Sequence, residues 1–319
     1  MFPAIQMSTQ VAVLQVSDQN GQLWQRYFHG AGMGPGTTFS TFARGISVFP
    51  ADAPMDTRIA ICGETYDSTL PAAVTPPYGS FMNLSPTGFI AVYDGNGNLL
   101  WSYQFYGQDQ NAQTAIADVS IRIDNLAVPP RDVVTYCGFS TNGVYQAVPG
   151  NPTTMPPTLP FAPPANPMGC SDLYAAGNVH NAFSPLVPTN QWDGIVGRVS
   201  SPRNAVAVTL DFHSIVGGAN DDVLLGISEV DRDRFAVVGA TRENVASGLN
   251  SVFPLTRPWF TGTTPVCFAT SPGLGLGVVM VFDAGPTRNN QALALLGSTL
   301  IGSPNGQTVA RDVLFHGGL

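Results

Sequence analysis

The fold of this chain is decided by Arg58-Ile-Ala-Ile-Cys-Gly63, Asp132-Val-Val-Thr-Tyr-Cys-Gly138 and Arg234-Phe-Ala-Val-Val-Gly239, which align on their final glycine. Each segment is short, apolar and closed by a residue that favours turns, which predicts a strand that ends at a turn. A pattern that returns three times along one chain indicates a structural repeat, and a repeat constrains the fold more than any single motif does.

A second strand is predicted shortly upstream of each segment, and two further strands follow it. The upstream strands are Gly45-Ile-Ser-Val48, Asp118-Val-Ser-Ile121 and Gly226-Ile-Ser-Glu229, with Asp312-Val-Leu-Phe315 as a fourth copy. The third strands lie at 11–16, 89–93, 195–199 and 278–282, and the fourth begin near Leu23, Leu100, Val206 and Leu293 and end at Gly30, Gly107, Gly217 and Gly302. We label these strands A to D in chain order. The sequence therefore predicts a repeated four-stranded antiparallel unit.

Read in order, one unit is GISV (45–48), RIAICG (58–63), FIAVYDGNG (89–97) and NLLWSYQFYG (98–107). This order resembles the bacterial β-propeller repeat of the SBBP type. Ile215-Val-Gly-Gly218 followed by Asp221-Asp222 is similar to the join between blades in that family. The family's DPSGN turn is replaced by Ser200-Ser-Pro-Arg-Asn204 and Ala284-Gly-Pro-Thr-Arg288. The resemblance implies an all-β propeller of four-stranded blades, an extracytoplasmic location at the cell surface, in the periplasm or secreted, and a binding or scaffolding role.

The phase of the repeat gives about four blade equivalents in a single domain over residues 1–319. The chain starts near a C strand and finishes on an A strand, so the terminal strands could form a composite blade that removes exposed sheet edges. The alternative is that these blades belong to a larger propeller. Both interpretations remain open from the sequence.

The B–C connections are much longer than the A–B connections, and long loops in a compact domain are usually functional or disordered. They run over 64–88, 139–192 and 240–277, and the second contains a Pro-rich insertion at about 146–190. We therefore expect partners to bind on the face that carries these connections, the B–C face. The aromatic candidates for that contact are Tyr66, Tyr145, Phe161, Trp192, Trp259 and Phe260.

Composition narrows the class of partner. The 13 basic residues are all arginine, the 21 acidic residues give a net charge of −8, and no basic stripe is present. This balance argues against nucleic acid and favours protein or polysaccharide as the partner. No stretch has the roughly 18 apolar residues of a membrane span, and the first ten residues do not resemble a signal peptide.

Catalytic and cofactor motifs are not evident, so enzymatic activity is disfavoured and no cofactor is expected. Asp94, Asn96 and Asn98 begin like a calcium loop, but a hairpin turn explains them better, because Phe105 stands where the loop needs a glutamate. Two alternatives to a binding scaffold stay open. One is a polysaccharide-active enzyme that uses the inner-strand carboxylates Asp118, Glu229 and Asp312, and the other is a structural subunit of a filament or large complex.

The four cysteines form no C-x-x-C pair. Cys62 and Cys137 hold equivalent places in the repeat, where Val238 replaces them, so we expect buried free thiols. Cys170 and Cys267 both fall in B–C connections, where a disulfide between them is one option and two free thiols the other.

Overall fold

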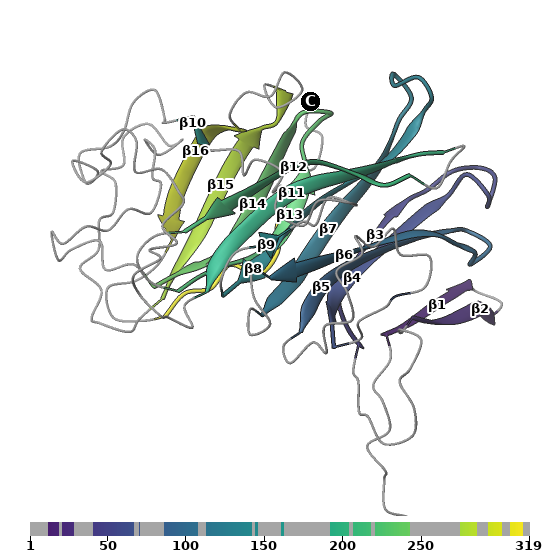
Figure 1. Ribbon diagram of the computed structural model, residues 1–319, viewed down its shortest axis with the longest axis horizontal. Coiled ribbons are helices and arrows are strands. Elements are labelled where there is room, and N and C mark those ends of the chain that lie inside the picture. Colours follow the sequence, from purple (N-terminus) through teal and green to yellow (C-terminus); the bar gives the residue numbers. More distant parts are fainter. Residues whose placement is uncertain are drawn as a thin grey trace, which may run out of the picture.

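The computed structural model describes residues 12–18, 21–28, 41–66, 70, 86–107, 113–141, 144–145, 161–162, 192–203, 207–217, 221–242, 275–285, 293–301 and 307–314. The described part is an all-β array. A hairpin lies at one end, and three larger antiparallel sheets follow it side by side in chain order (Figure 1). Within the described residues there is no helix that could cross a membrane.

The first large sheet has the strand order β3-β4-β5-β6-β9. Its strands are β3 (Thr41–Phe49), β4 (Arg58–Thr65), β5 (Thr87–Asp94), β6 (Leu99–Gly107) and the short β9 (Val144–Tyr145). Apart from β9, each strand pairs antiparallel with the next strand along the chain.

The second large sheet has the order β12-β11-β8-β7, with β7 (Thr114–Asp124), β8 (Arg131–Ser140), β11 (Asp193–Pro202) and β12 (Thr209–Val216). The third contains β13 (Asp222–Glu229), β14 (Arg234–Thr241), β15 (Leu276–Asp283) and β16 (Leu293–Ile301), and the short β10 (Phe161–Ala162) pairs with β16. Each large sheet thus contains one predicted A-to-D unit, which confirms the four-stranded antiparallel repeat.

The glycine-ended segments are the second strands of these sheets, as predicted, and Cys62, Cys137 and Val238 are buried in them. The prediction that each strand ends at its glycine was wrong, because β4, β8 and β14 each run two residues further. The A strand opposite each glycine contains a β-bulge. A Cβ at Gly63, Gly138 or Gly239 would overlap the carbonyl oxygen of Phe42, Ala115 or Val223. The repeated glycine is therefore required by a close approach of two backbones.

A hairpin of β1 (Ala12–Asp18) and β2 (Gly21–Phe28) covers the outer face of the first large sheet. Leu14 and Phe28 pack in one buried cluster with Ile59, Phe89 and Tyr93. Burying such side chains stabilises the contact by roughly 1.5–3 kcal/mol each. The hairpin occupies the place that the repeat predicts for a C–D pair.

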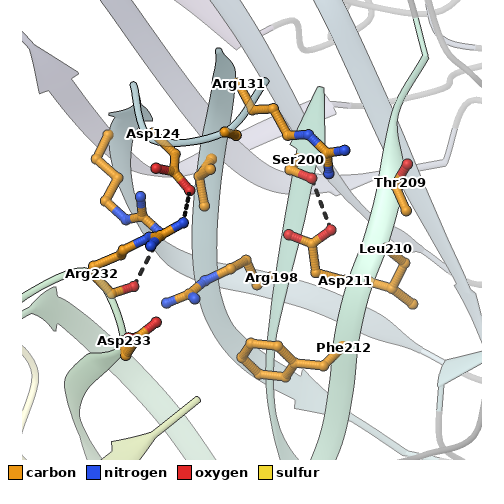
Figure 2. A pocket seen from close by; sticks show the side chains of 13 residues that line it. Asp124, Arg131, Arg198, Ser200, Thr209, Leu210, Asp211, Phe212, Arg232 and Asp233 are labelled. Carbon is orange, nitrogen blue, oxygen red and sulfur yellow. Dashed lines mark hydrogen bonds and ion pairs between the residues drawn. The ribbon is translucent and has the colours of Figure 1, made fainter. Parts of the chain in front are cut away.

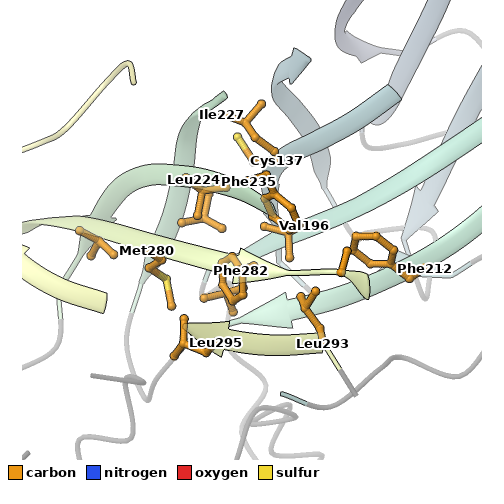
Figure 3. Close-up of a cluster of buried hydrophobic side chains, with 14 residues drawn as sticks. Cys137, Val196, Phe212, Leu224, Ile227, Phe235, Met280, Phe282, Leu293 and Leu295 are labelled. Atoms are coloured by element: carbon orange, nitrogen blue, oxygen red, sulfur yellow. The ribbon is translucent and has the colours of Figure 1, made fainter. Parts of the chain in front are cut away.

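The faces of neighbouring large sheets are joined by apolar clusters. Between the first and second sheets, Ile90 and Trp101 pack with Val119 and Tyr136. Between the second and third, Figure 3 shows Cys137, Val196 and Phe212 facing side chains of the third sheet, among them Phe235 and Phe282. The β-branched and aromatic residues that favour strands thus also supply the core between sheets.

The A strands meet across the sheet boundaries. Ser47 Oγ accepts a hydrogen bond from the backbone N–H of Ile121 (3.2 Å), and Asp118 Oδ2 accepts one from the backbone N–H of Ile227 (2.9 Å). A Cβ at Gly45 would lie within 3.0 Å of Asp118, and one at Gly226 within 3.0 Å of Asp312. Glycine in one A strand therefore makes room for aspartate in the next.

Residues 307–314 contain the described part of the predicted fourth A strand. They belong to no sheet in the described structure, but their backbone is attached to the third large sheet. Ala310 N–H donates to the carbonyl oxygen of Gly239 (3.1 Å), and Thr308 N–H donates to that of Gly275 (2.9 Å). The segment therefore lies beside the third sheet, where the repeat predicts the next A strand.

Candidate functional site

The predicted aromatic contacts of the B–C face fall mostly outside what the structure describes. Trp259 and Phe260 lie outside the described residues, as do Cys170 and Cys267, and only the backbone of Tyr145 and Phe161 is described, in β9 and β10. Tyr66 and Trp192 are partly buried. The candidate set on this face thus remains a prediction, apart from the surroundings of Trp192.

Trp192 packs at the junction of the second and third sheets. Its ring meets Phe139 edge-on, with 4.8 Å between the ring centroids, and it contacts the cluster that includes Ala115. Its backbone N–H donates to Asp221 Oδ1 (3.1 Å), and its carbonyl oxygen accepts from the N–H of Asp222 (2.6 Å). Trp192 therefore helps to hold the second and third sheets together at the edge where the B–C connections begin and end.

Asp221 joins these two sheets, as the sequence interpretation of the Asp221-Asp222 pair suggested. Besides accepting from Trp192, it binds Arg242 Nη1 through Oδ2 (2.7 Å), and its carbonyl oxygen accepts from the N–H of Arg242. The Asp221 carboxylate thus connects a backbone N–H of the second sheet with an arginine side chain of the third.

Buried polar side chains mark the B–C edge of each large sheet. Thr41, Thr65 and Thr87 lie opposite one another in the first sheet, and Thr114, Ser140 and Asp193 hold the same places in the second. Thr41 and Thr65 share a hydrogen bond between hydroxyls (2.8 Å), as do Thr114 and Ser140 (3.1 Å). Buried hydroxyls satisfied in this way hold the strand ends in register where a long connection departs. We did not predict these ladders, although a Thr or Ser stands two residues after each repeated glycine in the sequence.

A polar cavity of about 410 Å³ opens on the opposite face, between the second and third sheets (Figure 2). It is bordered by the ends of β7, β8, β11 and β12 and by the β13–β14 turn. Its charged lining consists of four arginines and three aspartates: Arg122, Arg131, Arg198, Arg232, Asp124, Asp211 and Asp233. We refer to it as the arginine–aspartate cavity.

Glu229 forms ion pairs with two of these arginines. Its Oε2 lies 3.0 Å from Arg122 Nε and its Oε1 lies 3.5 Å from Arg198 Nη2, and Thr135 Oγ1 donates to Oε1 (2.5 Å). Burial raises the pKa of Glu229, and the two guanidinium groups oppose that rise. Arg198 is further held by a hydrogen bond from its Nε to Thr135 Oγ1 (3.0 Å), and its guanidinium lies over the Phe212 ring. This network binds the second sheet to the third.

A third ion pair lies in the wall of the cavity. Arg232 Nη2 lies 2.9 Å from Asp124 Oδ2, and Arg122 Nη2 donates to the carbonyl oxygen of Arg232 (3.1 Å). Burial acts to raise the pKa of Asp124, but the hydrogen bond and charge of Arg232 outweigh it, so the net pKa is lowered. Three of the four arginines thus have a carboxylate partner.

Arg131 and Asp211 remain on the open side of the cavity. Arg131 Nε is buried and has no hydrogen-bond partner among the described residues, and no described carboxylate lies within 4.0 Å of the Arg131 guanidinium. Asp211 accepts a hydrogen bond from Ser200 Oγ on Oδ1 (2.8 Å) and stays in contact with solvent. Desolvation in the cavity wall raises the pKa of Asp211, against the effects of Ser200 and of Arg198 and Arg131.

A second cavity, of about 470 Å³, lies where the A strands meet, and we call it the central cavity. It is lined by parts of β3, β7 and β13 and by Arg311, Asp312, Val313 and Leu314. Burial raises the pKa of Asp118 in this lining, and the negative charge of Asp312 adds to that effect. Of the three carboxylates considered for catalysis, Asp118 and Asp312 border this cavity, whereas Glu229 is bound to Arg122 and Arg198.

The Asp94 segment and the other acidic residues can be compared with the requirements of a metal site. The described residues contain no group of three or more His, Cys, Asp or Glu side chains that could hold a metal. Asp94 instead forms a hairpin turn, because its Oδ1 accepts from the N–H groups of Asn96 and Asn98, and Gly97 has a φ of 78°. This confirms the hairpin interpretation of the Asp94 segment.

Comparison with known proteins adds no family. No protein-family model matches the chain, and no curated protein matches it.

Proposed function

We propose that this protein is a non-catalytic binding or scaffolding β-propeller of the SBBP type, working outside the cytoplasm, alone or as a subunit of a larger assembly. Its partner is a protein or a polysaccharide. The three antiparallel units, each with its A strand against the next, support the propeller arrangement. The central cavity adds to this support, since four A-type segments border it.

The arrangement of the connections supports binding through the B–C face. The long connections 66–86, 141–192 and 242–275 each leave the end of a B strand and return at the start of a C strand. At that edge Thr114 N–H donates to the carbonyl oxygen of Pro86 (2.9 Å), and the Asp222 N–H donates to that of Trp192. The edges of neighbouring sheets are therefore fixed to one another. Three long connections on one firmly joined edge are the observation that carries the proposal, because loops placed by a rigid scaffold are where binding residues concentrate.

The test compares the wild type with a variant in which residues 146–190 are replaced by a short Gly-Ser linker. Long surface insertions change closure entropy only logarithmically, so we expect the variant to keep its β circular-dichroism spectrum. We then crosslink each protein in cells of the source organism and identify the crosslinked residues by mass spectrometry. Partner contacts should map to the B–C connections in the wild type and should disappear in the variant. A matched control replaces 125–130, a turn on the opposite face, with a linker of equal length. Partner crosslinks that survive the deletion but disappear in the control would contradict the proposal.

A further inference from the structure

The arginine–aspartate cavity lies on the face opposite the B–C connections, so a ligand there is independent of partner binding through the loops. Its volume of about 410 Å³ is within the range of small-molecule sites, roughly 300–1,000 Å³. The walls are polar and come from two sheets that the Glu229 network holds together. The walls of the cavity are therefore held in place without a ligand.

Arg131 is the residue of this lining that can bind an anion. Arg122, Arg198 and Arg232 are already paired with Glu229 or Asp124, whereas no carboxylate of the described residues forms an ion pair with Arg131. Arg131 lines the cavity, and its planar guanidinium matches a carboxylate in geometry and charge. A ligand carboxylate beside Arg131 would supply the ion-pair partner that this arginine lacks among the described residues.

The aspartates limit the charge of that ligand and supply acceptors for it. Asp211 faces the cavity with its carboxylate, and Asp124 and Asp233 also line it (Figure 2). The three aspartates and Glu229 formally balance the four arginines, so the cavity has no net positive charge to hold a doubly charged phosphate or sulfate, while ligand hydroxyl groups can donate to the aspartates. The lining thus favours a single negative charge together with several hydroxyls.

We propose that the arginine–aspartate cavity binds a uronic acid unit, either free or as part of an acidic polysaccharide. The sugar carboxylate pairs with Arg131, and its ring hydroxyls donate to Asp211 and accept from the hydroxyl of Thr209, which is exposed at the cavity wall. Because no bond is made or broken, the site is a binding site and not a catalytic one.

The test is calorimetric titration with glucuronate, galacturonate and their short oligomers, with the methyl ester of each as the uncharged comparison. We expect the acids to bind and the esters to bind at least about tenfold more weakly, since the ester removes the charge that Arg131 recognises. Tighter binding of oligomers than of the monosaccharide would identify a polysaccharide as the source of the unit. Equal affinity for acid and monosaccharide ester, no binding of any uronate, or stronger binding of inorganic sulfate would each overturn the inference.

Variants assign the binding to this cavity. Arg131→Met should weaken uronate binding by about tenfold or more. Arg131→Lys keeps the positive charge and should therefore bind uronate more tightly than Arg131→Met does. Arg242→Met is the matched control, because Arg242 is an exposed arginine paired with Asp221 at the other face. Should Arg131→Met fail to fold, Asp211→Asn and Arg131→Lys keep the test decisive. Uronate binding that is unchanged in every folded cavity variant would contradict the assignment, and it would leave the proposal for the B–C face untouched.

Discussion

The carboxylate of Asp118 on β7 accepts the backbone N–H of Ile227 on β13 at 2.9 Å, so that a side chain in one large sheet satisfies the backbone of the next. The same A strand donates its Ile121 N–H to Ser47 on β3 at 3.2 Å. Contacts of this kind fix how the A strands of consecutive sheets lie against one another. The position of one sheet relative to the next is therefore set by hydrogen bonds as well as by apolar packing.

Replacing Asp118 should destabilise the stack of sheets. Asp118→Ala leaves the Ile227 N–H without its acceptor, and we expect a loss of about 1–3 kcal/mol in the free energy of unfolding by denaturant titration. Asp118→Asn keeps an acceptor oxygen and should lose less. Asp312→Ala, at an exposed position, is the control and should change stability by no more than about 0.5 kcal/mol. Equal losses in Asp118→Ala and Asp312→Ala would contradict the role given to the Asp118 hydrogen bond.

The glycine of the second strand should not tolerate a side chain. A Cβ at Gly138 would overlap the carbonyl oxygen of Ala115 opposite the bulge, so Gly138→Ala should cost about 1–3 kcal/mol or more in thermal or denaturant unfolding. Gly275→Ala is the matched control, because its nearest neighbour would stand at an ordinary 3.5 Å. A Gly138→Ala variant as stable as Gly275→Ala would show that the close approach of β7 and β8 can relax.

The ion pair between Arg58 and Asp132 should couple the first and second sheets strongly. Arg58 Nε lies 2.9 Å from both carboxylate oxygens, and the two side chains are only 5% and 3% exposed. Arg58→Met leaves a buried carboxylate without its main partner and should cost about 3–5 kcal/mol, whereas Arg58→Met with Asp132→Leu should cost less. The exposed pair of Arg242 and Asp221 is the comparison, and its loss should cost no more than about 1 kcal/mol. A double variant less stable than Arg58→Met alone would contradict this account.

His213 should make the fold sensitive to mild acid. Burial lowers its pKa from 6.5 to about 4, and Tyr136 Oη shares a hydrogen bond with its Nδ1 at 2.9 Å. The unfolded chain takes up a proton near pH 6.5 and the folded chain only near pH 4. The contribution of neutral His213 is therefore complete above pH 6.5 and is lost as the pH falls toward 4, on the order of 3 kcal/mol in total.

The measurement is urea unfolding of the wild type and His213→Gln between pH 4 and 7. The difference in unfolding free energy between the two proteins isolates His213 from the acidic groups, which titrate in both. We expect the wild type to lose more stability than the variant over this interval. Parallel pH profiles would show that His213 titrates normally in the folded protein.

The strands could be predicted well from the sequence because each repeat contains short apolar segments that can be recognised locally. The segments ending at Gly63, Gly138 and Gly239 predicted the second strand of every large sheet, and Asp94 to Gly97 predicted a hairpin turn. The bulges were missed, since a glycine that closes a strand and a glycine that faces a bulge look alike when the partner strand is unknown.

The arginine–aspartate cavity could not be predicted, because its groups come from distant parts of the chain. The hydrogen bond from Thr135 to Glu229 joins residues 94 positions apart, and that from Arg122 to the Arg232 carbonyl joins residues 110 positions apart. Carboxylates such as Glu229 were noted in the sequence as catalytic candidates, but their arginine partners depend on how two sheets face each other. Such pairing follows from tertiary structure and not from spacing.

We propose that four A-type segments surround the central cavity, and a spin-label distance between residues 46 and 314 tests this arrangement. Ile46→Cys and Leu314→Cys place labels at two exposed positions, on β3 and on the segment 307–314, in a background with Cys170→Ser and Cys267→Ser. Tyr27→Cys with Ile301→Cys, on the hairpin and on β16 at the two ends of the array in Figure 1, supplies the long reference distance. We predict a short and narrow distribution for the first pair, because both residues line one cavity of about 470 Å³. A distribution as long or as broad as that of the reference pair would show that residues 307–314 do not stand beside β3, and would contradict the propeller arrangement.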